Sequence, residues 1–367
     1  MTTDMRGLYV HIPFCVRKCR YCDFCSGTPT DDAIDRYIDS LEAECLLYYK
    51  DARPSVDTVF FGGGTPSILS KEQFSRVFKI IENSFDLSSV SELTVEVNPG
   101  TVTREKAELY RSLGINRISI GLQSIHDNEL KTLGRIHSYL DFLSTYRLFS
   151  ELGFGNISVD LMYGIPEQTV ESFRQTLLGV IELCPEHISA YGLIVEPGTP
   201  FFEMRESLPL PNEDTERDMY DLACGMLGDA GYSHYEISNY ARPGAECRHN
   251  LKYWRCEEYI GIGAAAHSYY LGTRFENSCD VPNYNRVAGI EIFGEDAAYE
   301  YAMMRLRLKE GICLSEYRER FGVDFILGKE KILSEYERMG LLVLEDDRLC
   351  LSEAGFYLSN SVLVSIL

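Results

Sequence analysis

The first half of the sequence alternates short runs of β-branched and other apolar residues with amphipathic helical stretches. We expect strands at 8–12, 58–61, 93–97, 117–121, 157–162 and 188–195. Apolar residues recur at helical spacing between Ile34 and Tyr48, and again over 71–85, 104–113, 139–152 and 169–183. Consecutive parallel strands need a crossover, usually a helix. Six such units predict an α/β fold, an incomplete (β/α)6 barrel open on one side.

In barrels of parallel strands, functional residues gather on the loops that follow the strands. The loop after the first predicted strand reads CVRKCRYCDFC and places Cys15, Cys19 and Cys22 at C-x3-C-x2-C spacing. Three thiolates on one short loop can bind three irons of a cuboidal iron–sulfur cluster and leave the fourth iron without a protein ligand. The alternative is a structural zinc site with Cys25 as the fourth sulfur ligand.

The second predicted strand is followed by a glycine-rich turn, GGGTP, which contains Gly63, Gly64 and Thr65. Glycines let the backbone approach a ligand closely and expose N–H and C=O groups to a charged head group. A phosphate-binding loop is disfavoured because no Gly-Lys-Ser/Thr follows. A plain tight turn is the structural alternative.

Together the cysteine loop and the GGGTP turn resemble the radical SAM family. In that family the C-x3-C-x2-C loop holds a [4Fe–4S] cluster, and the open iron is chelated by the amino and carboxylate groups of S-adenosylmethionine (SAM). An electron from the cluster can cleave SAM to a 5′-deoxyadenosyl radical. The resemblance implies Cys15, Cys19 and Cys22 as cluster ligands. It leaves open whether SAM is cleaved or only bound, so catalytic residues stay unknown.

Further positions resemble the SAM-contacting residues of the coproporphyrinogen-oxidase-like branch of this family. With the turn they are Tyr9, Tyr21, Gly63, Gly64, Thr65, Glu96, Gln123, Arg135 and Asp160. Carboxylates and Gln can accept from ribose hydroxyls or an ammonium group, and Arg can bind a carboxylate at two points. Each residue alone also has a structural interpretation, such as a helix cap or a solvated surface charge.

Two departures from the oxygen-independent coproporphyrinogen III oxidases disfavour oxidase activity. Cys15 lies close to the start, without the longer extension that precedes the cluster loop in those enzymes. They also carry a cysteine two residues after the third ligand, where this sequence has Phe24 and places Cys25 one residue later. The loop CRYCDF is instead similar to that of the HemW haem chaperones, which are related to the oxidase.

A second stretch resembles the HNxxYW signature of the chaperones. It comprises His249, Asn250, Tyr253 and Trp254, the only tryptophan of the chain. Imidazole can ligate haem iron, and aromatic faces suit a porphyrin. The locally basic residues Arg242, Arg248, Lys252 and Arg255 would suit the propionates. The alternative is a loop whose aromatic residues fill the barrel mouth and whose His bonds to backbone.

The axial haem ligand is left open between His249, Cys247 and His267, the last in the family-like segment GIGAAAHSY. The remaining histidines show no ligand spacing and are interpreted as structural. They are His11, His126, His137, His187 and His234. Cys25 has no assigned role beyond packing or a reactive thiol.

The C-terminal part changes to helices at 297–308, 314–321 and 327–339, followed by a hairpin of 341–344 and 348–351. This order predicts a small winged-helix-like α+β domain, similar to the C-terminal domain of the oxidase family. The predicted division is a barrel core at 1–235, a connecting segment with the HNxxYW motif at 236–295, and the C-terminal domain at 296–367. DNA binding is disfavoured by the net charge of −21 and by the evenly mixed charges of the third helix.

The resemblance implies a haem chaperone that binds a [4Fe–4S] cluster, SAM and haem and transfers haem to haem-protein clients. Alternatives are coproporphyrinogen III oxidation and radical SAM chemistry on another substrate. Scattered cysteines and the lack of a signal peptide or membrane span favour a reducing cytoplasm, with at most peripheral membrane association. Client identity stays open, as does the formation of a homodimer.

Overall fold

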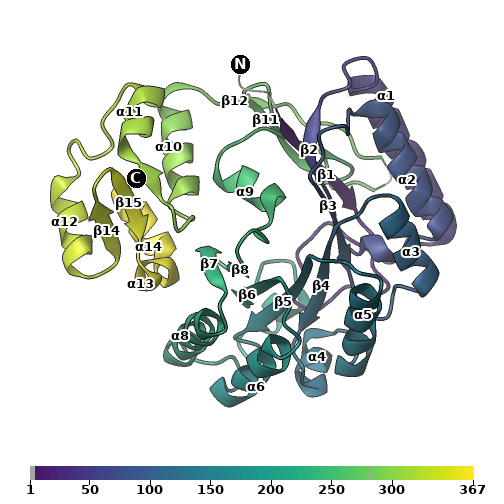
Figure 1. Cartoon of the computed structure of the whole chain (residues 1–367), viewed down its shortest axis with the longest axis horizontal. Coiled ribbons are helices and arrows are strands. Elements are labelled where there is room, and N and C mark those ends of the chain that lie inside the picture. Colours follow the sequence, from purple (N-terminus) through teal and green to yellow (C-terminus); the bar gives the residue numbers. More distant parts are fainter. Residues whose placement is uncertain (1–4, 282) are drawn as a thin grey trace.

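A computed structural model of the chain describes residues 5–281 and 283–367. Its centre is a set of parallel strands paired in chain order (Figure 1). They are β1 (Arg6–Ile12), β2 (Val56–Gly63), β3 (Glu92–Val97), β4 (Arg117–Gln123), β5 (Ile157–Tyr163) and β6 (His187–Gly192). The six predicted strands are confirmed, except that the sixth was drawn three residues too long. Beyond Gly192 the chain leaves the sheet, and Leu193 and Val195 pack with the buried side chain of Phe201.

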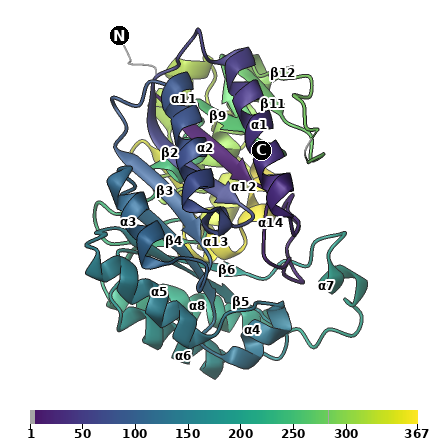
Figure 2. The ribbon, with the colours of Figure 1, turned by 90° about the vertical axis from the view of Figure 1, so that its right-hand side faces the viewer.

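Helices cover the outer face of these strands, as Figure 2 shows. They are α1 (Asp31–Tyr48), α2 (Lys71–Ser84), α3 (Arg104–Ser112), α4 (Asp127–Leu133), α5 (Tyr139–Glu151), α6 (Val170–Ile181) and α8 (Glu213–Asp229). The short η1 (Pro66–Ile68) follows β2, and the short α7 (Pro200–Glu203) lies on the loop after β6. Ser70 and Gln73 form a capping box at the start of α2, so two otherwise unpaired N–H groups are satisfied. The predicted helices are confirmed, and α4 and α8 are additional.

Strand alternation divides the sheet into an apolar outer face and a polar inner face. On β4, Ile118 and Ile120 are fully buried in one core with side chains of the covering helices. Between them, Ser119 faces the other side of the strand, and on β5 Asp160 does the same. Because successive side chains of a strand point to opposite faces, the polar residues gather inside the barrel.

The sheet extends beyond the parallel core at both edges and contains 12 strands among the described residues. At the β1 edge, β9 (Tyr259–Ile262) pairs parallel with β1, and β10 (His267–Tyr270), β11 (Thr273–Glu276) and β12 (Ile290–Glu291) follow antiparallel. At the other edge, β8 (Asn239–Ala241) and β7 (Ser233–Glu236) add antiparallel to β6. The barrel is therefore incomplete, as predicted, and residues 236–295 supply strands to both of its edges.

A buried carboxylate fastens the added edge to the first helix. Glu44 of α1 accepts hydrogen bonds from the Gly263 N–H at 2.9 Å, from Asn277 Nδ2 at 2.8 Å and from the Tyr284 hydroxyl at 3.0 Å. Nearby, the Tyr37 hydroxyl donates to the His11 carbonyl at 2.8 Å. The segment after β9 is thus tied to the helix that follows the cysteine loop.

The C-terminal domain stands beside the barrel (Figure 1). It consists of α10 (Gly294–Arg305), β13 (Ile312–Cys313), α11 (Leu314–Phe321), α12 (Glu330–Arg338), β14 (Leu342–Glu345), β15 (Arg348–Leu351), α13 (Glu353–Tyr357) and α14 (Ser359–Ile366). Its own apolar core surrounds a small antiparallel sheet of order β13-β15-β14. The predicted winged-helix-like α+β domain is confirmed. Within the described residues, the helices are all too short or too polar to cross a membrane.

We expect Glu44→Ala to destabilise the protein, because it removes the acceptor for two buried donors and one partly buried donor. The free energy of unfolding should fall by about 3 kcal/mol, measured by urea or thermal denaturation. Glu42→Ala is the matched control, because Glu42 is exposed on the same helix and pairs with Arg76 at the surface. It should change stability by less than about 1 kcal/mol. Equal effects of both substitutions would contradict the role given to Glu44.

Candidate functional site

The cysteine loop is closed at its base and attached to its surroundings. The Cys15 N–H donates to the Gly27 carbonyl at 2.9 Å, and the Gly27 N–H donates to the Pro13 carbonyl at 3.0 Å. Further along, the Arg20 N–H donates to the Leu133 carbonyl at 2.9 Å at the end of α4. A loop with such anchors presents its side chains in a fixed arrangement.

Cys15, Cys19 and Cys22 line one cavity of about 520 Å³ inside the barrel. Most of the other predicted site residues line it too: Tyr21, Gly63, Gly64, Thr65, Glu96, Gln123, Arg135, Asp160 and Asn250. They come from loops and strand ends far apart in sequence. The structure therefore brings together residues that the sequence could associate only through the family resemblance.

The glycine turn lies directly against the cysteine loop. The Gly64 N–H donates to the Ile12 carbonyl at 2.8 Å. A Cβ atom on Gly64 would lie 2.7 Å from the carbonyl oxygen of Phe14 and 2.8 Å from its nitrogen. Gly63 has φ +107° and a Cβ there would meet the His11 ring at 2.5 Å. Close approach of the two backbones requires glycine at both positions.

A chain of polar contacts connects the cavity wall to two of the cysteines. Arg135 donates from Nη2 to Asn98 Oδ1 at 2.9 Å, and Asn98 donates from Nδ2 to Thr65 Oγ1 at 2.7 Å. The Thr65 hydroxyl lies 3.4 Å from Cys15 Sγ, and Arg135 Nη1 lies 3.7 Å from Cys19 Sγ. Asn98 was missed by the sequence analysis, although it belongs to the same strand end, VEVNP, as Glu96.

Two carboxyl groups share the cavity. Burial, reinforced by the nearby charge of Asp160, raises the pKa of Glu96 to about 8. Burial also raises the pKa of Asp160, which accepts from the Ser119 hydroxyl at 3.1 Å. Glu96 accepts from the Gly63 N–H at 3.1 Å. Because burial disfavours the charged form, an incoming cationic ligand would stabilise these carboxylates.

Of the predicted SAM-contacting residues Tyr9 and Gln123, only Gln123 lines the cavity. Tyr9 is absent from the cavity lining, but its ring stacks on Phe60, which does line the cavity. The Tyr9 hydroxyl lies 3.0 Å from His11 Nδ1. Gln123, at the end of β4, has a left-handed backbone with φ +73° and accepts from the Tyr191 hydroxyl at 2.8 Å. Strained backbone of this kind is often found at ligand sites.

The HNxxYW stretch forms a short helix, α9 (Arg248–Trp254), where the sequence analysis had left a loop as one alternative. The carboxylate of buried Glu92, at the start of β3, accepts hydrogen bonds from the first N–H groups of α9. The Arg248 N–H donates at 2.9 Å and the His249 N–H at 3.0 Å. A carboxylate at a helix N-terminus satisfies free donors and suits the helix dipole. Glu92 is a second residue that the sequence analysis missed.

His249 is fully enclosed by partners. Its Nδ1 lies 2.9 Å from Thr58 Oγ1, its Nε2 lies 2.7 Å from the Tyr253 hydroxyl, and its ring stacks on Phe60. Burial, together with the charge of Lys252, lowers the pKa of His249 to about 3. The imidazole is therefore neutral, and both of its nitrogens are engaged.

The helix α9 separates two cavities. Asn250 lines the cysteine cavity, whereas Arg248, Leu251 and Lys252 line a larger cavity of about 910 Å³ between the barrel and the C-terminal domain. Tyr253, Trp254 and His249 line neither of these two cavities. The four residues of the signature are thus close in sequence but do not share one surface.

The alternative haem ligands and the basic residues occupy different environments. Cys247 is fully buried, with Sγ 3.6 Å from Glu92 Oε1, and His267 is exposed and pairs with Glu276. Two of the predicted basic residues are paired with acids: Lys252 with Asp57 and Glu257, and Arg255 with Glu310. Arg242 packs over the Tyr232 ring.

Cys25, which had no assigned role, forms a disulfide with Cys279, 254 residues away. This bond joins the end of the cysteine loop to the segment after β11. A structural zinc site with four cysteine ligands on this loop would need Cys25 as its fourth thiolate. The bond therefore argues against the zinc alternative.

Residues 9–178 match the Radical SAM superfamily, and residues 294–358 match the HemN C-terminal domain. The structure titled "Coproporphyrinogen III oxidase (HemN) from Escherichia coli is a Radical SAM enzyme" superposes with a TM-score of 0.87 over 99% of this chain and 90% of that chain. At 23% identity it shows the fold. Fold and site define a radical SAM protein with a HemN-type C-terminal domain.

Near full-length relatives narrow this class. "Heme chaperone HemW" of Bacillus subtilis (strain 168) is 34% identical over 98% of both chains. "Heme chaperone HemW" of Escherichia coli (strain K12) is 42% identical over 71% of this chain and 69% of its own length. "Radical S-adenosyl methionine domain-containing protein 1, mitochondrial" of Bos taurus is 34% identical over 98% of this chain and 87% of its own length. The chain belongs to the HemW family.

We expect Gly64→Ala to displace the cysteine loop, because the new Cβ would collide with the Phe14 backbone. The iron and sulfide content after anaerobic reconstitution should fall several-fold. Gly27→Ala is the matched control, because Gly27 lies at the base of the same loop and a Cβ there meets nothing within 4 Å. Normal iron content in Gly64→Ala would show that the close approach is dispensable.

Proposed function

We propose that this protein is a haem chaperone that carries a [4Fe–4S] cluster on Cys15, Cys19 and Cys22 and binds SAM in the adjoining cavity. The observation that carries the proposal is the near full-length relationship to proteins named heme chaperone HemW. When bound, the cluster supplies the electron that can cleave SAM. The cytoplasmic location stays a prediction, and the identity of the clients and the formation of a homodimer stay open.

The chemistry of the cavity fits these groups. Three sulfur donors lie on one loop, which suits a cluster with one iron left open. The buried Arg135 Nε has no hydrogen-bond partner in the described part of the chain, so an anionic group such as the SAM carboxylate would satisfy it. Glu96 and Asp160 offer acceptors for an ammonium group or ribose hydroxyls.

For haem, we propose that His249 binds the iron after a local rearrangement of α9. The imidazole is neutral, as iron ligation requires, but both nitrogens are engaged. Nε2 becomes available if the Tyr253 phenol moves away. This movement would also open the aromatic group of Phe60, Tyr253 and Tyr259 to a porphyrin face.

The cluster assignment predicts that replacing any one of Cys15, Cys19 or Cys22 with Ala abolishes the visible absorption of the reconstituted protein. Cys184→Ala is the control, because Cys184 is an exposed free cysteine outside the loop. A loop variant that keeps the full spectrum and iron content would contradict the assignment.

The haem assignment is tested by anaerobic haem titration of the cluster-loaded protein, followed by absorption. Wild type should bind haem stoichiometrically, and His249→Ala should weaken binding at least tenfold and alter the Soret band. Exposed His267→Ala is the control and should leave both unchanged. If only His267→Ala weakens binding, the ligand lies on β10 and the α9 assignment fails. If wild type binds no haem, the chaperone proposal fails, and coproporphyrinogen turnover becomes the next assay.

A further inference from the structure

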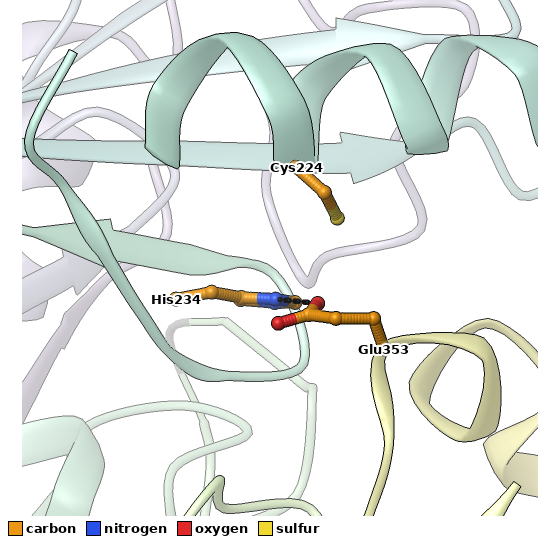
Figure 3. Close-up of side chains that lie close together, drawn as sticks. All are labelled: Cys224, His234 and Glu353. Carbon is orange, nitrogen blue, oxygen red and sulfur yellow. Dashed lines mark hydrogen bonds and ion pairs between the residues drawn. The ribbon is translucent and has the colours of Figure 1, made fainter. Parts of the chain in front are cut away.

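The second cavity has a cluster of potential metal ligands at its wall, away from the cysteine loop. Cys224 comes from α8, His234 from β7 and Glu353 from α13 of the C-terminal domain (Figure 3). Their ligand atoms all lie within 4.8 Å of one another. Figure 3 shows the three side chains converging on a common space. Sulfur, imidazole nitrogen and carboxylate oxygen together are a ligand set that suits Zn²⁺.

The orientation of His234 makes one ring nitrogen available. Nε2 lies 3.3 Å from the Ile237 carbonyl, which can only accept, so Nε2 carries the proton. Nδ1 then has a free lone pair in the neutral ring, and it lies 2.9 Å from Glu353 Oε2. Metal-binding histidines usually donate their other N–H to a carbonyl or carboxylate in this way.

Two acceptors that face each other at this distance need a positive charge between them. In the metal-free protein a proton between His234 Nδ1 and Glu353 Oε2 fills this role. A divalent cation would replace that proton and add the Cys224 sulfur. Zinc–ligand bonds of about 2.0–2.3 Å require the three ligand atoms, which lie within 4.8 Å of one another, to draw closer together.

The surroundings restrict the orientation of the ligands in such a site. Tyr240 stacks on the His234 ring, with centroids 4.3 Å apart, and its hydroxyl lies 3.2 Å from Cys224 Sγ. Lys309 pairs with the other oxygen of Glu353, so the carboxylate would bind the metal through Oε2 alone. The adjoining cavity of about 910 Å³ gives water access to a fourth position.

We propose that Cys224, His234 and Glu353 form a Zn²⁺ site with water as the fourth ligand, joining the barrel to the C-terminal domain. Binding releases the Cys224 thiol proton and the His234 Nδ1 proton to solvent. Neither the iron–sulfur cluster nor haem takes part, so the proposal is independent of the proposed function.

Co²⁺ serves as a spectroscopic probe of Zn²⁺ in the full chain. The background is Cys15→Ala/Cys19→Ala/Cys22→Ala, so that the cysteine loop cannot bind the metal. We expect one Co²⁺ per chain, with a thiolate-to-cobalt charge-transfer band, tetrahedral visible bands and displacement by Zn²⁺. Cys224→Ser should abolish the charge-transfer band, and His234→Gln should weaken binding at least tenfold.

Two further variants keep the test decisive. Exposed Cys184→Ser should leave the spectrum and affinity unchanged. Glu353→Gln, at a partly exposed position, tests the carboxylate with little disturbance of the fold and should weaken binding several-fold. Circular dichroism checks the folding of each variant. Absence of stoichiometric binding, or binding that survives both Cys224→Ser and His234→Gln, would overturn the proposal and leave a simple imidazolium–carboxylate pair.

Discussion

The pairing of β1 on both sides determines where the site can form. β1 runs parallel to β2 on one side and to β9 on the other, and the cysteine loop leaves its carboxyl end. Helix α1 then returns along the sheet, and Glu44 and Tyr37 fasten the chain after β9 beside that loop. If β1 were an edge strand, the loop would lack one of its two walls. The cofactor cavity thus depends on a strand held from both sides.

Much of the barrel was predictable because each parallel strand is a short apolar run that is followed by a stretch with apolar residues at helical spacing. Alternation along β5 also explains why Asp160 points inward. Gln123 instead follows a register shift on β4 and has a left-handed backbone, which alternation does not predict. The added strands β7 to β12 have only two to four residues each, too short for a pattern to emerge. Their positions depend on pairing between distant segments.

The parts of the site that were missed are long-range contacts between ordinary residues. Glu92 meets α9 across more than 150 residues, and Cys25 meets Cys279 across 254. His234 was interpreted as structural because no ligand lies near it at a regular spacing, yet Glu353 reaches it from another domain. Local patterns cannot contain such contacts. The signature residues of α9 were recognised in the sequence. Their placement in different environments was not predicted, because it depends on which side of the helix faces each cavity.

Because helix α9 forms a wall of both cavities, its position can couple ligand binding in one cavity to ligand binding in the other. Asn250 belongs to one side and Lys252 to the other, while His249 is held between them by Thr58 and Tyr253. Any ligand that shifts this helix from one side changes the affinity on the other side, and linkage requires the reverse effect to be equal in binding free energy. The larger the displacement of α9 that a ligand causes, the more strongly ligand binding in one cavity changes the affinity in the other.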